Sequence, residues 1–455
     1  MHFHRSKKMR NFIIIFLIVF LSACSTKNAL NYEPNKNFKD ENETFRLEKK
    51  WYKLYNQNQL NELVEEVLKN NIDFKIASLN LARAYENAGL ISADLFPTLS
   101  AGADFTTNRD ISTNDNFRKK YQAKVEINYE VDLLGKILSR KYASDWLATA
   151  DEFDLQSLKL TLINSAVSGY FKEIYLNEAL NFTERNIKSY EKLNEIINIK
   201  VAYGKSEPLE LKQTENALLN LQNKKLSLIS QLKNNELFLR NLLGNDSEFL
   251  TPVSQIENIK FLGVDMSAPY IALSNRPDLR AAISRINVSF YDYRVSQLEF
   301  FPNVSLGASL SSNDEKFKDA FKLNFFSGNV SINLPFLYYS RLKSRLRISQ
   351  IDFKINVKKY EKALSEAVNE VRNLYEIYEI SLNNLQNLKK NYENAAKIAE
   401  IYNAKYDAGR AELKDYLEAD TAAIDAKISL ISQYYTVLET ENKIYRSMSA
   451  KFYKK

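Results

Sequence analysis

Strict alternation of apolar and polar side chains marks four segments of this chain as β-strands. The clearest lies within residues 121–132, where the apolar members are Ala123, Val125, Ile127, Tyr129 and Val131 and the residues between them are polar. The same pattern recurs at about residues 97–107, 302–311 and 328–335. It predicts four strands of about 8–11 residues, arranged as two hairpins with one apolar and one polar face each.

The pattern elsewhere favours long helices. Between residues 137 and 202 there is no proline and a single glycine, Gly169, so a continuous helix there would reach roughly 99 Å. Further on, leucine occupies seven of the ten heptad positions from Leu211 to Leu242, which is typical of a coiled-coil seam. Glycine and proline together supply only 18 of 455 residues, and so few turn formers also favour long elements.

The sequence repeats itself at a separation of 205 residues. Three blocks of the first half match blocks of the second half at this spacing: 71–77 with 276–282, 96–103 with 301–308, and 203–207 with 408–412. Similarity caused only by a composition rich in Asn, Lys and Leu would not preserve one spacing. We therefore expect two structural repeats, residues 60–250 and 276–455, joined by a linker at residues 251–275.

The four expected strands are too few to close a barrel by themselves. A soluble sandwich could use the same alternation, with its polar faces in water. Strands near ten residues long with one apolar face also fit a transmembrane barrel. Because open sheet edges cannot stand in lipid, the strands would then have to close with those of other copies, and a trimer would supply twelve.

The N-terminus supports a membrane setting. A basic stretch precedes an apolar run at residues 12–21, which is too short to span a bilayer comfortably and has the form of a signal peptide. The run ends in Leu-Ser-Ala-Cys, which resembles a bacterial lipobox and predicts removal of residues 1–23 and lipidation of Cys24. Residues 24–59 would then form an N-terminal lipid-anchored segment. The alternative is an ordinary signal peptide followed by a chance cysteine, although Cys24 is the only cysteine of the chain.

Composition excludes several classes of function. The chain carries 63 Lys and Arg against 56 Asp and Glu, and residues 1–23 hold four of the basic residues and none of the acidic ones. The mature chain would therefore be nearly neutral, at +3, which removes the case for nucleic-acid binding. Both histidines, His2 and His4, lie in the removed part, which excludes histidine catalysis and histidine-ligated metals. We expect no catalytic residue, no metal site and no cofactor apart from the lipid on Cys24.

Several motifs together resemble the TolC-like outer membrane efflux proteins, in particular the lipoprotein branch that serves RND-type pumps. They are Asn-Asn-Ile-Asp at 70–73, Asp-Leu-Leu-Gly-Lys at 132–136 and Asn-Arg-Pro-Asp-Leu at 275–279, with Gly204 and Gly409 where that family's helical hairpins turn. The resemblance extends from Cys24 to the end of the chain. One departure lies at residues 334–339, where the family often has a Gly-Gly pair.

The resemblance implies an α+β membrane protein built from two structural repeats. Three copies would form a 12-stranded transmembrane β-barrel in the outer membrane, continued by a long periplasmic α-helical coiled-coil barrel. The implied function is that of a passive, gated exit duct for drugs or other small molecules, the outer membrane channel of a tripartite efflux system. The implied partners are the other copies of a homotrimer, outer membrane lipid, a periplasmic adaptor protein and an inner-membrane RND-type pump that drives export.

The resemblance also places a gate at the tip of the second hairpin. Asp415 and Glu418 are three residues apart and hence on one helix face, and acidic residues at these positions ring the periplasmic aperture in the family. Three copies would present six carboxylates, a ring that attracts cations. From the spacing alone, both residues are as well explained as solvated charges on a polar helix.

Polar links between neighbouring coiled coils hold such tips closed in the family. Glu210 and Tyr406 match one such link, in which a carboxylate accepts a hydrogen bond from a phenol. The family's arginine position in the second repeat is occupied by Ala411, and the sequence leaves open whether Arg410 replaces that arginine.

The family's tips also contact the adaptor. The corresponding residues here are Gly204, Lys205, Gly409 and Arg410. The two glycines have a second explanation as turn residues, because a positive φ is accessible to glycine without steric strain.

Two other classes of protein fit parts of the sequence. A non-channel lipid-anchored coiled-coil scaffold or adhesin predicts helices without four amphipathic strands and without a duplication that includes strands. A lipid-anchored hydrolase with two catalytic carboxylates needs acidic residues on pocket loops, whereas the acidic residues here lie mainly in the helical repeats. The strands and their duplication therefore favour the duct.

Overall fold

The computed structural model describes residues 32, 45–112, 116–244, 255–265 and 270–454. Cys24 and the expected signal peptide lie outside these residues. The described residues from 45 to 454 belong to one compact unit. In the part of the chain that is described, no helix combines the length and the apolar character needed to cross a membrane.

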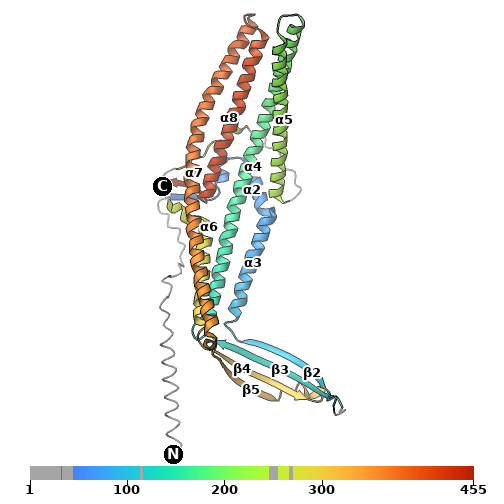
Figure 1. The fold of residues 1–455 in the computed structure, drawn as a ribbon, viewed down its shortest axis with the longest axis vertical. Helices are drawn as coiled ribbons and strands as arrows, with labels where there is room; N and C mark the ends of the chain where they lie inside the picture. Colours follow the sequence, from blue (N-terminus) through green and yellow to red (C-terminus); the bar gives the residue numbers. More distant parts are fainter. Residues whose placement is uncertain (1–31, 33–44, 113–115, 245–254, 266–269, 455) are drawn as a thin grey trace, which may run out of the picture. The chain divides into compact units, whose positions relative to one another are not determined.

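Four strands form one antiparallel sheet in the order β2-β3-β4-β5 (Figure 1). They are β2 (Thr98–Asn108), β3 (Arg118–Val131), β4 (Asn303–Asp314) and β5 (Phe325–Asn333). The pairing places Ala101 opposite Val125 and Ile127 opposite Ala308, so apolar residues of neighbouring strands share a face, as the alternation predicts. Every residue of β2 and β5 is exposed. Within the chain, these two strands are the open edges of the sheet.

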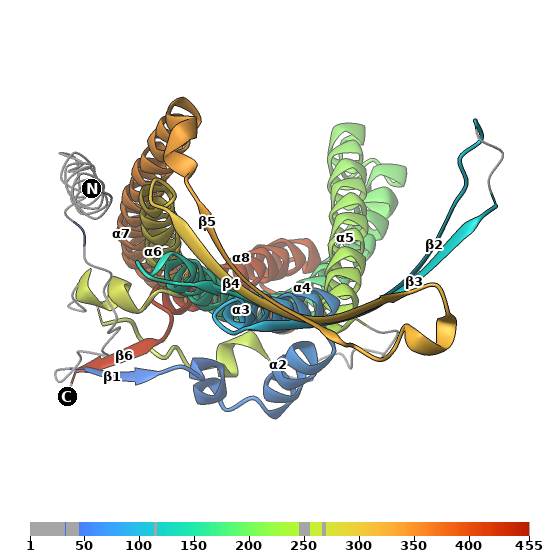
Figure 2. The ribbon, with the colours of Figure 1, turned by 90° about the horizontal axis from the view of Figure 1, so that it is seen from below.

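Each strand hairpin is preceded by a short helix and followed by a long one. The short helices are α3 (Ile72–Ala93) and α6 (Pro277–Leu298), and the long ones are α4 (Lys136–Ala202) and α7 (Tyr339–Asp407). α3 packs on α4, α4 on α6, and α6 on α7. Next to the sheet the helices therefore follow the order α3-α4-α6-α7, with α3 and α7 at the margins (Figure 2).

At their far ends the long helices turn back as α5 (Pro208–Leu243) and α8 (Leu413–Ser447) (Figure 1). α5 packs on α4, α4 on α8, and α8 on α7, so α5 and α7 are the margins of this second part. The buried side of α5 includes the heptad residues Thr214, Leu221, Leu228 and Asn235. The coiled-coil seam predicted for this segment is therefore present.

The main hydrophobic core combines α2 (Asn58–Asn70), the middle of α4 and parts of α5 and α8. Trp51, Phe171 and Ile431 have no solvent exposure. The indole N–H of Trp51 donates to Asn442 Oδ1 at 3.0 Å. Beside this core the strands β1 (Phe45–Glu48) and β6 (Lys451–Lys454) pair as a second small sheet, which joins the beginning of the described unit to its end.

One buried carboxylate, that of Glu441 on α8, joins several segments of this core. Its Oε1 accepts from the backbone N–H of Gly263 at 2.5 Å and from Tyr378 Oη at 3.4 Å. Its Oε2 accepts from the backbone N–H of Leu262 at 3.2 Å and from Tyr55 Oη at 3.0 Å. Burial raises the pKa of Glu441. The segment between the two halves of the chain is thus attached to the N-terminal part, α7 and α8 at once.

Candidate functional site at the tips of the helical hairpins

Both helical hairpins turn on a glycine in the left-handed backbone region. Gly204 has φ +62° and Gly409 has φ +67°, values at which a side chain would be strained. The backbone N–H of Gly204 donates to Val201 O at 3.0 Å, and that of Gly409 donates to Tyr406 O at 2.9 Å. The two turns repeat one geometry, and the interpretation of both glycines as turn residues is confirmed.

The turns are exposed to solvent. Gly204, Lys205, Gly409 and Arg410 are all in the exposed class, and a β-carbon built at either glycine would meet nothing within 4 Å. Arg410 makes no ion pair with the residues that the structure describes. The tips therefore present bare main chain and two cationic side chains to the outside.

α8 begins with a capping box, which stabilises a helix N-terminus by reciprocal hydrogen bonds. The side chain of Glu412 accepts from the backbone N–H of Asp415, and the backbone N–H of Glu412 donates to Asp415 Oδ2 at 3.1 Å. Glu418, one turn further along, is exposed and lies 4.0 Å from Lys414. Asp415 therefore has a structural role at this tip, whereas Glu418 is the more exposed of the two carboxylates.

Among the described residues, three ion pairs join the hairpins to each other, and one of them, between Lys224 on α5 and Asp425 on α8 at 3.5 Å, lies below the tips. Lys414 at the start of α8 pairs with Glu210 on α5, and Lys200 near the end of α4 pairs with Glu412. Ser206 also donates to Glu210. The side chains of Lys414 and Glu210 are 26% and 30% exposed, so water screens the pair and its net contribution is about 0–1 kcal/mol. Contacts of this strength suit a reversible link.

Glu210 therefore has partners within its own chain that the sequence analysis did not find. Tyr406, on α7, makes no hydrogen bond to Glu210 in the described part of the chain and is 39% exposed. A link between these two residues in neighbouring copies stays a prediction. The sequence shows that Lys414 and Glu418 are four residues apart, but it does not show that α8 approaches α5. For this reason no sequence pattern identified Lys414 as the partner of Glu210.

Polar contacts continue between α4 and α8 below the tips. Ser189 Oγ donates to Asp420 Oδ2 at 3.2 Å, and Asn186 Nδ2 donates to Asp425 Oδ1 at 3.2 Å. Burial, reinforced by Asp420, raises the pKa of the Tyr416 phenol. Within the described ranges, no group of three or more His, Cys, Asp or Glu side chains is placed to hold a metal ion. A single chain thus offers a set of reversible polar links between two helical hairpins.

A four-stranded sheet with open edges that continues into two long helical hairpins is the fold of an outer membrane channel subunit. The solved outer membrane channel CmeC of Campylobacter jejuni shares it with a TM-score of 0.78 and 21% sequence identity, over 93% of this chain and 93% of that one. At residues 334–339, where the sequence departs from the family pattern, a 3-10 turn (Pro335–Tyr338) leads into α7 and leaves this fold intact.

A sequence profile of the family described as outer membrane efflux protein matches residues 63–245 and again residues 268–450, and the chain belongs to this family. A relative named toxin and drug export protein A, from Aggregatibacter actinomycetemcomitans, is 29% identical over 442 residues, 96% of this chain and 97% of that protein. The probable outer membrane lipoprotein SilC of Salmonella typhimurium is 23% identical over 397 residues, 86% of this chain and 84% of that protein.

Membership of this family establishes the broad function. The chain is an outer membrane efflux protein, located in the outer membrane and acting as a channel for export. The family consists of transport channels and is not a family of enzymes. The expected α+β fold is confirmed, and the channel is favoured over a coiled-coil scaffold or adhesin.

Proposed function

We propose that three copies of this chain close into one channel. The observation that carries the proposal is that the open edges of the sheet and the marginal helices beside it coincide. The edge strand β2 follows helix α3 at one margin, and the edge strand β5 leads into helix α7 at the other. β5 of one copy can therefore pair with β2 of the next, while α7 lies along α3 of that same neighbour. Open strand edges cannot stand in lipid, and a closed ring of identical subunits removes all of them.

In this trimer the sheets form a 12-stranded transmembrane β-barrel, and the helices continue it as a periplasmic coiled-coil barrel. The edge strands carry exposed apolar side chains suited to lipid, among them Leu99, Phe105, Val330 and Ile332. We assign residues 60–250 and 276–455 to two repeats joined by residues 251–275. Two observations support this division: α3 and α6 begin 205 residues apart, and the family profile matches twice.

We further propose that residues 1–23 are a signal peptide, that Cys24 carries a lipid and that residues 24–59 form the anchored segment. The name of the SilC relative, a probable lipoprotein, supports this assignment. An inner-membrane pump of the RND type, coupled through a periplasmic adaptor, would drive drugs or other small molecules through the duct. The printed name of the drug export relative supports this class of cargo. The duct itself is passive and needs no catalysis.

The tips of the hairpins form the gate in this proposal. The ion pairs Lys414–Glu210 and Lys200–Glu412 hold the two hairpins of one copy together, and the gate opens when they separate. Because each pair contributes only about 0–1 kcal/mol, binding of an adaptor to the exposed turns suffices to break them. The turn residues in question are Gly204, Lys205, Gly409 and Arg410.

Asp415 and Glu418 line the aperture of the closed gate. Threefold symmetry repeats both carboxylates three times around the axis, and a narrow ring of carboxylates favours cations over anions. A bond from Tyr406 to Glu210 of a neighbouring copy would add a further link between the hairpins.

Single-channel conductance in a planar bilayer tests the duct and the gate separately. The wild type is expected to show discrete, cation-selective steps. Asp415→Asn combined with Glu418→Gln should lower the cation selectivity, and the asparagine oxygen can still accept the capping hydrogen bond. Lys414→Gln should raise the open probability because Glu210 loses its partner. The matched control is Lys397→Gln, which breaks an ion pair of 2.8 Å within α7 alone and should leave the gate unchanged.

Each part of the proposal has its own refuting result. A monomer in detergent without conductance would overturn the duct. Unchanged selectivity in the double variant would move the constriction away from Asp415 and Glu418. An unchanged open probability in Lys414→Gln would leave the duct standing and remove this ion pair from the gate.

A further inference from the structure

Helix α3 carries a stripe of exposed side chains on the side away from α4. Its members recur at alternating spacings of four and three residues: Ile72, Ile76, Leu79, Arg83, Glu86 and Leu90. The four apolar members are 51–72% exposed, whereas Ala84 and Ala88 supply the buried side of the helix. This spacing is that of a coiled-coil seam, yet in a single chain the seam faces solvent. We call these six residues the α3 stripe.

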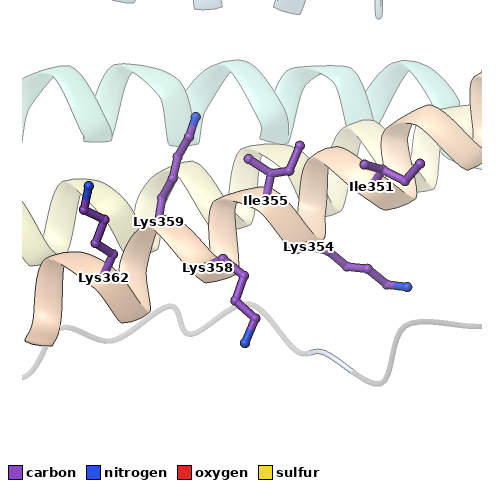
Figure 3. A pocket seen from close by; sticks show the side chains of 6 residues that line it. All are labelled: Ile351, Lys354, Ile355, Lys358, Lys359 and Lys362. Carbon is purple, nitrogen blue, oxygen red and sulfur yellow. The ribbon is translucent and has the colours of Figure 1, made fainter.

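The beginning of α7, at the opposite margin, carries a similar stripe. Its exposed members are Arg345, Ile348, Ile351, Asp352 and Ile355, which we call the α7 stripe. Leu342 and Phe353 are on the buried side. A hollow along α7 adjoins the stripe and is lined by Ile351, Lys354, Ile355, Lys358, Lys359 and Lys362. In Figure 3, Lys354 and Lys358 point to the other side of the helix from the two isoleucines. The α7 stripe thus combines isoleucines with charged residues, as the α3 stripe combines apolar and charged ones.

The charges of the two stripes follow opposite orders. α3 ends, and α7 begins, at the same end of the sheet, so the two helices run antiparallel when the margins meet. Measured from that end at 1.5 Å per residue, Glu86 lies about 10 Å and Arg83 about 15 Å along α3. On α7, Arg345 lies about 9 Å and Asp352 about 20 Å along. Counted from the sheet end, the charges are negative then positive on α3 and positive then negative on α7. The two charge orders are therefore complementary when the helices meet.

The apolar members fall at matching heights as well. Leu79 and Ile76 lie about 21 Å and 26 Å from the sheet end of α3. Ile351 and Ile355 lie about 18 Å and 24 Å from the sheet end of α7. In this antiparallel register Glu86 comes level with Arg345 and Ile76 with Ile355, while Asp352 lies between the heights of Arg83 and Leu79.

Contacts within the chain leave Glu86, Arg345 and Asp352 undercompensated, whereas Arg83 interacts with Asp151 of α4. Glu299 is 3.5 Å from Arg345 and 3.9 Å from Arg140, so two guanidinium groups share one carboxylate. Asp352 stands near a like charge, because burial together with Asp352 raises the pKa of Asp292. Among the described residues neither Glu86 nor Asp352 has an ion-pair partner. Opposite charges supplied by another copy would compensate Arg345, Glu86 and Asp352.

We propose that the α3 stripe of one copy docks on the α7 stripe of the next copy, in the register in which Glu86 meets Arg345 and Leu79 packs against Ile351. The inference rests on the homotrimer proposed above and adds the surface and the residues that fix its register. The charge order selects a second copy of this chain as the occupant, since anionic lipid would match Arg345 and the isoleucines but would be repelled by Asp352.

Charge reversal tests the register. Glu86→Arg and Arg345→Glu should each shift the trimer–monomer equilibrium in detergent at least about tenfold towards monomer, because like charges then face each other. The two changes in one chain should restore most of the trimer, as measured by sedimentation velocity. Asn80→Arg is the matched control, since it adds the same charge to an exposed position of α3 outside the stripe, and it should change nothing.

Cysteine cross-linking gives a second test that does not depend on repulsion. Leu79→Cys with Ile351→Cys in one chain should yield disulfide-linked dimers and trimers on non-reducing gels, whereas Leu79→Cys with Ile398→Cys, much further along α7, should not. Each single cysteine controls for cross-links to Cys24. A wild-type trimer without these cross-links and without rescue by the double charge reversal would overturn the docking register and leave the trimer standing. A wild-type monomer would overturn the trimer itself.

Discussion

Replacing Glu441 by glutamine should loosen the segment that joins the two halves of the chain. Each carboxylate oxygen of Glu441 accepts from one backbone N–H, that of Gly263 at 2.5 Å or that of Leu262 at 3.2 Å. A glutamine offers one oxygen and one NH₂ group. Whichever way the amide is turned, the NH₂ group faces one of these backbone donors, which cannot turn away. One backbone N–H therefore loses its acceptor.

The size of the effect follows from two opposing terms. An N–H left without an acceptor costs about 1–3 kcal/mol, and the remaining bonds lose their charge assistance. Against this, burial raises the pKa of Glu441, which means that it disfavours the ionised carboxylate. A neutral glutamine avoids this cost. We expect the local opening free energy of the segment to fall by about 1.5–3 kcal/mol, which is roughly a tenfold to hundredfold rise in the opening constant.

Hydrogen exchange of a peptide that contains Leu262 and Gly263 measures this opening directly. In the Glu441→Gln variant these amides should exchange faster by the same factor, while peptides from the strands and the hairpin tips keep their wild-type rates. The matched control is Glu400→Gln, because Glu400 is an exposed carboxylate with an ion pair of 2.8 Å within α7. Rates for the two amides within about threefold of wild type, in a folded variant, would refute the account of Glu441.

Further substitutions test the packing, the turns and the core. Gly169→Ala should lower stability by about 1–3 kcal/mol through overpacking, because its β-carbon would lie 2.6 Å from Leu239 Cδ2; in thermal unfolding, the loss should be less than additive with Leu239→Ala. Gly409→Val should cost about 1–2 kcal/mol at φ +67° and Gly409→Asn clearly less, and equal melting temperatures would contradict this. Trp51→Phe should cost about 1–3 kcal/mol in denaturant unfolding because Asn442 loses a buried donor, and wild-type stability would show that the bond is dispensable.

Strands and turns were predictable from the sequence where they depend on residues close together in the chain. Alternation placed a strand at residues 97–107, and β2 spans Thr98–Asn108. It failed where alternation breaks down: β5 begins at Phe325, three residues before the predicted start, because two adjacent phenylalanines precede the alternating part. β3 likewise begins at Arg118 with three consecutive basic residues, which no apolar pattern can mark. The hairpin turns were visible because glycine is favoured at a positive φ.

The partners of charged side chains were not predictable. Lys414 looks like any lysine on a polar helix, and only the approach of α8 to α5 brings it to Glu210. Glu441 lies in a helical segment with ordinary heptad spacing, and only the fold surrounds it with two backbone donors and two phenols. Both contacts join residues far apart in the sequence, so no spacing rule describes them.

The sequence by itself determined the four strands, the long helices, the hairpin turns and the duplication, because period-2 alternation, heptad spacing and glycine each act over a few residues. The tertiary structure alone decided which strands and helices stand at the margins, since an edge exists only once the order of neighbours is known. It also decided which charges are paired at the tips and which remain uncompensated on α3 and α7. The surfaces that join one copy to the next follow from those margins.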